Sequence, residues 1–156
     1  GLHSHSDGII HMEPQTSEDA GKNATLGRYM RYGGWSVDAE GYSFLGTKRT
    51  DGDTCAGKPG RFQWATAAWD GTNPAGKQKY TVRTGNPSGL KLDNGEVVIL
   101  AFLPEGKQVI ALGNPPSIKN LPNAENIETP PGQMPPVNGA PTPSTGTPPT
   151  SGTPAP

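Results

Sequence analysis

The sequence predicts a β-rich domain of the α+β class, in which a small mixed sheet carries one short helix. Two observations lead to this class. The 156 residues include 22 glycines and 18 prolines, so turns are frequent and long helices are few. Only one segment has apolar residues at helical spacing, whereas several short segments are alternating or continuously apolar, which is typical of strands.

The chain is expected to begin with a hairpin. Residues 2–5 and 9–13 form two short strands around Ser6-Asp7-Gly8, because an Asp-Gly pair is a turn signal. Pro14 ends the second strand, and the polar residues 15–24 form a loop.

The helix is expected in the next segment, where Thr25 can cap its N-terminus. Leu26, Tyr29 and Met30 then share one face, at spacings of three and four residues, and Gly33 stops the helix. It is about two turns long.

Further strands are expected after the helix, with a long turn-rich connection over residues 47–60. The most apolar strand, 96–102, is expected to be central in the sheet and covered on both faces. Asp70-Gly71 ends the strand 61–69, in which Phe62 and Trp64 are expected in the core. A packing role is favoured for Trp69 as well, and the alternative is an exposed platform that binds sugar or peptide. The expected strands are 37–46, 61–69, 77–84, 90–92, 96–102 and 107–112.

The composition divides the chain into one domain over residues 1–124 and a tail over residues 125–156. No charged residue follows Glu128, and Pro, Gly, Ser and Thr dominate the rest of the chain. Such a segment buries too little apolar surface to offset the entropy of ordering, so a disordered, partly polyproline II tail is expected. Gly1 directly precedes a strand, which favours a domain truncated at its N-terminus.

The charge pattern excludes two classes of partner. The formal net charge is −1 and both signs are mixed along the chain, so there is no basic patch of the kind that nucleic acid or an anionic membrane surface requires. No signal peptide is visible, and the longest apolar run, 97–103, is too short to span a bilayer. The single cysteine, Cys55, is a free thiol or bonds to an upstream segment.

All three histidines of the chain lie in the expected hairpin, and the turn decides whether they meet. Side chains alternate along a strand, so His3 and His5 share one face about 6.6 Å apart, and His11 and Glu13 likewise share one. A two-residue turn would pair Ser4 with His11 and separate the histidines. A three-residue turn, with Gly8 in the left-handed conformation, pairs His3 with His11 and His5 with Ile9.

The three-residue turn is favoured because it sends Leu2, Ile10 and Met12 together to the core. It also puts His3, His5, His11 and Glu13 on one face, which predicts a site for Zn²⁺, Cu²⁺ or Ni²⁺, since imidazole suits all three metals. No organic cofactor is indicated.

If only the imidazoles bind, Glu13 orients His11 or acts as a base on a metal-bound water. The alternative is a hairpin without metal, with solvent-facing histidines and a hydrogen bond from His11 to Glu13 or the backbone.

Three functions follow from these alternatives. The first is a non-enzymatic module that binds a transition metal. The second is a metal-dependent hydrolase or redox enzyme that uses the same residues. The third is a metal-free surface or interaction domain whose tail is a spacer.

No nucleophile elbow, Walker loop or dinucleotide motif is present. Asp51-Gly52-Asp53 is expected to be a solvated turn and not a Ca²⁺ loop.

Two resemblances add to this reasoning. The order strand, strand, helix and further strands is similar to a β-grasp arrangement, which implies a mixed sheet with a helix across its face. The phrases LHSHSDGIIHMEP, TLGRYMRYGGW and LDNGEVVILAFLPEG resemble a group of bacterial extracytoplasmic proteins of unknown function. The resemblance to the extracytoplasmic group implies an exported or cell-surface protein with a metal site. It also implies attachment to the membrane or cell wall through an upstream segment. It does not indicate which reaction or which protein partner the chain has. The chain departs from the group at Tyr29-Met30, where an aromatic pair is expected, and in a longer 36–88 region.

Overall fold

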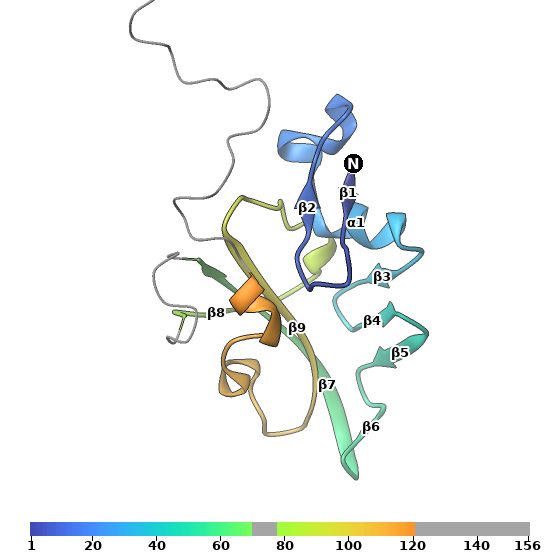
Figure 1. Ribbon diagram of the computed structural model, residues 1–156. Helices are drawn as coiled ribbons and strands as arrows, with labels where there is room; N and C mark the ends of the chain where they lie inside the picture. The colour runs from blue at the N-terminus through green and yellow to red at the C-terminus, as the bar shows by residue number, and fades with distance from the viewer. Residues whose placement is uncertain (70–77, 121–156) are drawn as a thin grey trace, which may run out of the picture.

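The computed structural model describes residues 1–69 and 78–120 (Figure 1). The expected tail over 125–156 and the expected turn at Asp70-Gly71 lie outside these residues. Within them, the chain forms nine strands in three small sheets, one α-helix and several short 3-10 helices. The predicted β-rich α+β class is confirmed.

The largest sheet is built around β7 (Lys58–Ala68). Along one side, β9 (Glu96–Pro104) pairs with β7 from Gly60↔Pro104 to Ala68↔Glu96. Along the other side lie β6 (Thr54–Cys55) and β8 (Thr81–Arg83), one after the other. The eleven-residue β7 is therefore the central strand.

The prediction that 96–102 is the central strand was wrong in part. Among the described residues, β9 pairs with β7 alone and so lies at an edge. Both of its faces are covered, as expected: Val97, Ile99 and Ala101 are buried on one side, and Val98 and Leu100 pack against core residues on the other. A continuous apolar run reports that both faces are covered, but it does not report how many neighbouring strands are paired.

Two further hairpins lie where a loop was expected over residues 47–60. One joins β4 (Gly41–Phe44) to β5 (Thr47–Thr50), and the other joins β6 to β7. Their two-residue turns, Leu45-Gly46 and Ala56-Gly57, have positive φ at both positions, as a type I′ turn requires. Leu and Ala rarely adopt this conformation, and they stand here where a type I′ turn usually has Asn or Asp. The sequence therefore did not indicate either turn.

Three other expectations also need correction. Residues 107–112 form no strand; Val109–Leu112 is instead a 3-10 helix, η4. Residues 90–92 contribute only an isolated bridge, Thr25↔Lys91. Every strand pair among the described residues is antiparallel, so these strands do not form the mixed sheet of a β-grasp arrangement.

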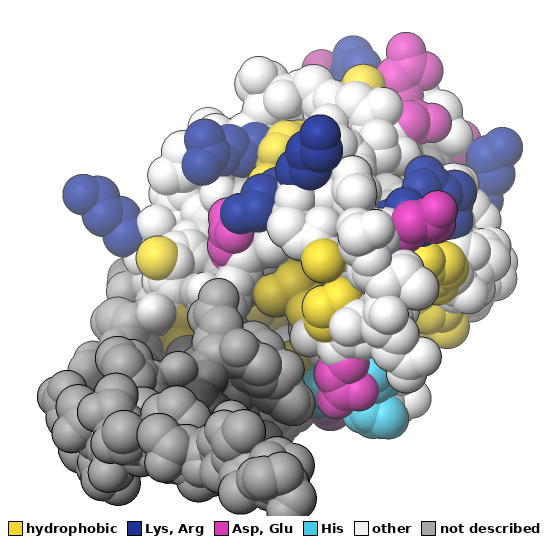
Figure 2. Space-filling view, turned by 90° about the horizontal axis from the view of Figure 1, so that it is seen from above, with side chains coloured by type: hydrophobic (Ala, Val, Ile, Leu, Met, Phe, Trp, Pro, Cys, Tyr) yellow, Lys and Arg dark blue, Asp and Glu magenta, His cyan; other side chains and the backbone are white. Residues whose placement is uncertain are grey.

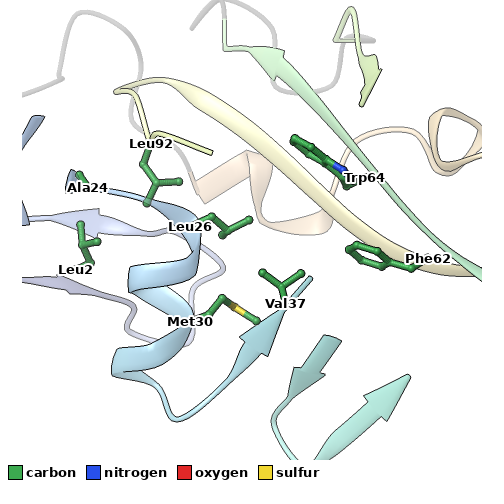
Figure 3. Close-up of a cluster of buried hydrophobic side chains, with 8 residues drawn as sticks. All are labelled: Leu2, Ala24, Leu26, Met30, Val37, Phe62, Trp64 and Leu92. Atoms are coloured by element: carbon green, nitrogen blue, oxygen red, sulfur yellow. The ribbon is translucent and has the colours of Figure 1, made fainter. Parts of the chain in front are cut away.

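The helix α1 (Leu26–Tyr32) forms where it was predicted. The Thr25 hydroxyl accepts a hydrogen bond from the Arg28 amide, and Gly33 ends the helix. Leu26 and Met30 are 2% exposed and face the largest core cluster (Figure 3). None of the helices in residues 1–69 and 78–120 is long and apolar enough to cross a membrane.

The largest core cluster joins four parts of the fold. Leu2 comes from β1 (Leu2–His3), Leu26 and Met30 from α1, and Val37 from β3 (Ser36–Val37). The predicted pair, Phe62 and Trp64, supplies the β7 side of the cluster. In the view of Figure 3, the side chains of Leu26 and Met30 lie between Leu2 and the two aromatic residues of β7. The cluster is completed by Ala24 and Leu92.

The opposite face of the β7–β9 pair is closed by η4 and the residues near it. Val109 is fully buried against Ala65, Ile99 and Ala101. Trp69, predicted to pack, is 9% exposed in a third cluster with Ile118. Both faces of the β7–β9 pair are thus covered by apolar side chains, and the hairpin and α1 pack on one of them.

We predict that Val109→Ala lowers the free energy of unfolding by about 1.5–3 kcal/mol, because it removes two buried methyl groups and leaves a cavity. Ile110→Ala is the matched control, since Ile110 is the next residue of η4 and is 45% exposed. It should change stability by less than about 0.5 kcal/mol. Urea unfolding measures both. Equal effects would contradict the placement of η4.

Candidate metal centre

The N-terminal hairpin has the predicted register. β1 pairs with β2 (His11–Met12) through Leu2↔Met12 and His3↔His11. The ends are closed by Gly1 and Glu13, whose backbone groups exchange hydrogen bonds of 2.6 and 3.1 Å. The expectation that His3 and His11 are cross-strand partners is confirmed.

The turn itself is wider than the three-residue turn that was expected. The ladder stops at His3↔His11, so the predicted pair of His5 with Ile9 does not form. Instead, the Ile9 amide donates to Asp7 Oδ1 at 3.0 Å, which replaces a ladder hydrogen bond with a side-chain one. Ser6 and Gly8 both have positive φ, at 64° and 77°.

The far face of the hairpin packs as predicted. Leu2 is 3% exposed in the largest core cluster, and Ile10 and Met12 are partly buried against the same cluster. This packing leaves the histidines on the outer face.

The three imidazole rings lie against one another. Their ring centroids are 4.8 Å apart for His3 and His5, 4.8 Å for His5 and His11, and 5.4 Å for His3 and His11. His3 Nε2 and His5 Nε2 are within hydrogen-bond distance at 3.1 Å. Figure 2 shows the histidines gathered in one surface patch with an acidic side chain beside them.

The carboxylate that meets the histidines is Asp7. Its Oδ2 lies 3.0 Å from His11 Nε2, and its Oδ1 accepts from the Ile9 amide and, at 3.4 Å, from the Ser4 hydroxyl. The hydrogen bond with His11, and next the one from Ile9, lower the pKa of Asp7 to about 2. Asp7 is therefore an anion at neutral pH. Sequence reasoning assigned this residue to the turn alone and missed its contact with His11.

Glu13 lies at the other end of the ladder and is exposed. Its backbone closes the hairpin with Gly1, but its carboxylate makes no hydrogen bond or ion pair with His3, His5 or His11 in the described part of the chain. A role for Glu13 in metal binding stays a prediction.

The possible metal-binding atoms lie in two separate pairs and do not surround one point. His3 Nε2 is paired with His5 Nε2, and His11 Nε2 with Asp7 Oδ2. No group of three or more His, Cys, Asp or Glu side chains within residues 1–69 and 78–120 is arranged to hold a metal ion as it stands. The separations within the two pairs, 3.1 and 3.0 Å, are nevertheless close to the value of about 3.3 Å between ligand atoms of a tetrahedral zinc site. To hold one ion, the four side chains would have to turn toward a common point, and all four are at least partly exposed.

A groove of about 720 Å³ runs from the hairpin toward the start of β9. His11 lies on its wall, and apolar side chains that include Ile10, Met12 and Ile118 line much of it. At the β9 end lies Glu96, whose Oε2 is buried and has no hydrogen-bond partner among the described residues. Burial, and secondly repulsion from Asp93, raise the pKa of Glu96.

The carboxylates of Asp51 and Asp53 already have hydrogen-bond or ion-pair partners close by. Asp51 accepts from the Phe62 amide at 2.6 Å and pairs with Arg61, and Asp53 accepts from the Thr50 amide at 2.8 Å. Residues 51–53 form a turn, as expected, but the Asp51 carboxylate ties it to β7 and is not simply solvated. Cys55 is a half-buried free thiol near the Phe102 carbonyl.

We predict that Glu96→Gln raises the melting temperature at pH 7. A carboxyl whose pKa is higher in the folded than in the unfolded state destabilises the fold when it is charged, and this cost disappears below the unfolded pKa. The gain should therefore shrink as the pH falls toward about 4. Thermal melts of both proteins at the two pH values measure it, with the exposed Glu105→Gln as control. A gain that does not change with pH would contradict the stated cause.

Comparison with known proteins gives no relative from which a function could be carried over. No family model, no curated protein and no solved structure matches this chain. Function is therefore inferred from the chain's own side chains, and the likeness to the extracytoplasmic group stays an expectation.

Proposed function

We propose that this chain is a non-enzymatic module that binds one transition-metal ion, Zn²⁺, Cu²⁺ or Ni²⁺, through His3, His5 and His11. The observation that carries the proposal is the His3↔His11 register, which places three imidazoles with ring centroids within 5.4 Å of one another. Imidazole nitrogen is a good ligand for all three ions.

The backbone around the cluster supports this function. A metal site needs donors that approach one another without a large entropic cost, and strand pairing supplies that proximity for His3 and His11. The core packing of Leu2 fixes which face of the hairpin points outward. The bound ion would in turn stabilise the hairpin, because only the folded chain offers the three donors together.

A module that binds metal without a reaction is favoured over an enzyme for a chemical reason. Catalytic metal sites need a position for water or substrate and a base held near it. Here the nearest carboxylate, Asp7, is already bonded to His11 and to the Ile9 amide, and Glu13 is apart from the rings. The groove that reaches His11 is the one feature that favours the metal-dependent enzyme instead.

The metal-free alternative also has a specific observation in its favour. His11 pairs with Asp7, and His3 pairs with His5, so these polar groups have partners without an ion. In that case the hairpin is a surface feature of an interaction domain. An extracytoplasmic location is part of our proposal in either case, and it depends on the likeness of the motifs.

We predict that the untagged chain binds about one equivalent of Zn²⁺, because its only imidazoles lie in one cluster. The double variant His3→Ala/His11→Ala should bind less than about a tenth of an equivalent, since a single imidazole remains. Mass spectrometry of metal content after mild purification, followed by calorimetric titration, measures both. Glu105→Gln, which removes an exposed carboxylate away from the hairpin, is the control.

Less than about a tenth of an equivalent in the wild type as well would end the metal proposal and favour the interaction domain. Equal binding by the wild type and the double variant would place the metal elsewhere. Metal that is bound together with an exchangeable water would favour the enzyme over the closed binding module.

A further inference from the structure

We propose that Asp7, and not Glu13, is the fourth donor of the metal site, which makes it a closed shell of three imidazole nitrogens and one carboxylate oxygen that selects Zn²⁺ over Cu⁺. This inference deepens the proposed function and rests on it. Asp7 was not among the donors that the sequence suggested, and its role follows from the conformation of the turn.

The distances support a single shell built from two existing pairs. His3 Nε2 and His5 Nε2 are 3.1 Å apart, and His11 Nε2 and Asp7 Oδ2 are 3.0 Å apart. Neighbouring ligand atoms of a tetrahedral site at zinc distances are about 3.3 Å apart. The separation within each pair is therefore close to the length of one edge of such a tetrahedron. The contacts of His5 and of His3 with His11 place the two pairs side by side.

The turn holds Asp7 in an orientation suited to one-oxygen binding. Oδ1 is taken by the Ile9 amide at 3.0 Å and lies 3.4 Å from the Ser4 hydroxyl, whereas Oδ2 points to His11. A ligating carboxylate is commonly fixed in this way, with its second oxygen hydrogen-bonded to the protein. The wide turn that breaks the expected pair of His5 with Ile9 thus brings a carboxylate to the imidazoles.

The chemistry of this donor set determines the class of ion. Three neutral imidazoles and one carboxylate carry a single negative charge, and they combine borderline nitrogen with hard oxygen. Such a set suits Zn²⁺, whereas Cu⁺ prefers thiolate and thioether sulfur. Met12 is the only sulfur of the hairpin, and it packs against the core cluster on the other face. A four-donor shell without an open position holds an ion and does not activate water.

Glu13 provides a matched comparison within the same hairpin. Both residues are carboxylates within two residues of a histidine in the sequence, but only Asp7 contacts an imidazole. Glu13 is exposed, and its part in the hairpin is made through its backbone. Replacing each carboxylate by its amide removes the same charge and keeps nearly the same shape.

The test compares Asp7→Asn with Glu13→Gln in the full chain. Affinity for Zn²⁺ is measured by competition with a chromophoric chelator, and the shell is read from the visible absorption of Co²⁺ placed in the same site. We expect Asp7→Asn to weaken Zn²⁺ binding by about 100-fold or more and to lower the Co²⁺ absorption, because water replaces a protein donor. Glu13→Gln should change affinity by less than about twofold and leave the spectrum as it is. The wild type should bind Zn²⁺ far more tightly than it binds Cu⁺ under anaerobic conditions.

Asn keeps an oxygen that can accept from the Ile9 amide, so the turn should survive; circular dichroism checks this. If Asp7→Asn does not fold, Asp7→Ser keeps a hydroxyl acceptor at the same position and should show the same loss. An Asp7 variant that is folded and binds as the wild type does, or that loses less than about tenfold with an unchanged Co²⁺ spectrum, would overturn the inference. A loss in Glu13→Gln alone, or a preference for Cu⁺, would also overturn it. These results would leave the proposed function intact, whereas a wild type without metal would remove both.

Discussion

The cross-strand pair His3↔His11 is the contact on which the candidate site depends. The ladder that contains it has only two residue pairs, and a hairpin this short is marginal in water. Its register must therefore be fixed from outside the ladder. A slip of one residue would exchange the two faces and turn Leu2 toward solvent, at a cost of about 1.5–3 kcal/mol for that side chain alone.

The core provides this fixing. Leu2 belongs to the cluster that includes Met30 of α1 and Trp64 of β7, so one apolar side chain ties the N-terminal strand to the helix and the main sheet (Figure 3). The sheet is in turn held from its other face by Val109. Apolar packing on the far side of the hairpin thus determines which face carries the imidazoles. The same arrangement leaves the donors in two hydrogen-bonded pairs, and a metal ion would have to replace those pairs with stronger bonds.

The sequence was sufficient where side-chain pattern and backbone chemistry agree. Thr25, the apolar spacing after it and Gly33 gave the helix and both of its ends, and the alternation around Gly8 gave the histidine register. It was insufficient where the backbone adopts a conformation that its residues disfavour. Leu45 has a φ of 48°, a conformation that Asn, Asp or Gly usually supplies in such a turn. Because the residue is Leu, the sequence did not indicate the β4–β5 hairpin.

The position of Asp7 in the site was missed for a related reason. A side chain that replaces a ladder hydrogen bond changes the local conformation in a way that strand alternation cannot anticipate.

The proposed site requires the three imidazoles to act as one ligand set. Imidazole ¹⁵N chemical shifts recorded during a Zn²⁺ titration test it most directly. We expect one ring nitrogen of each histidine to change together, with completion at about one equivalent. Rings that respond at different metal concentrations, or a response from one ring alone, would contradict the claim.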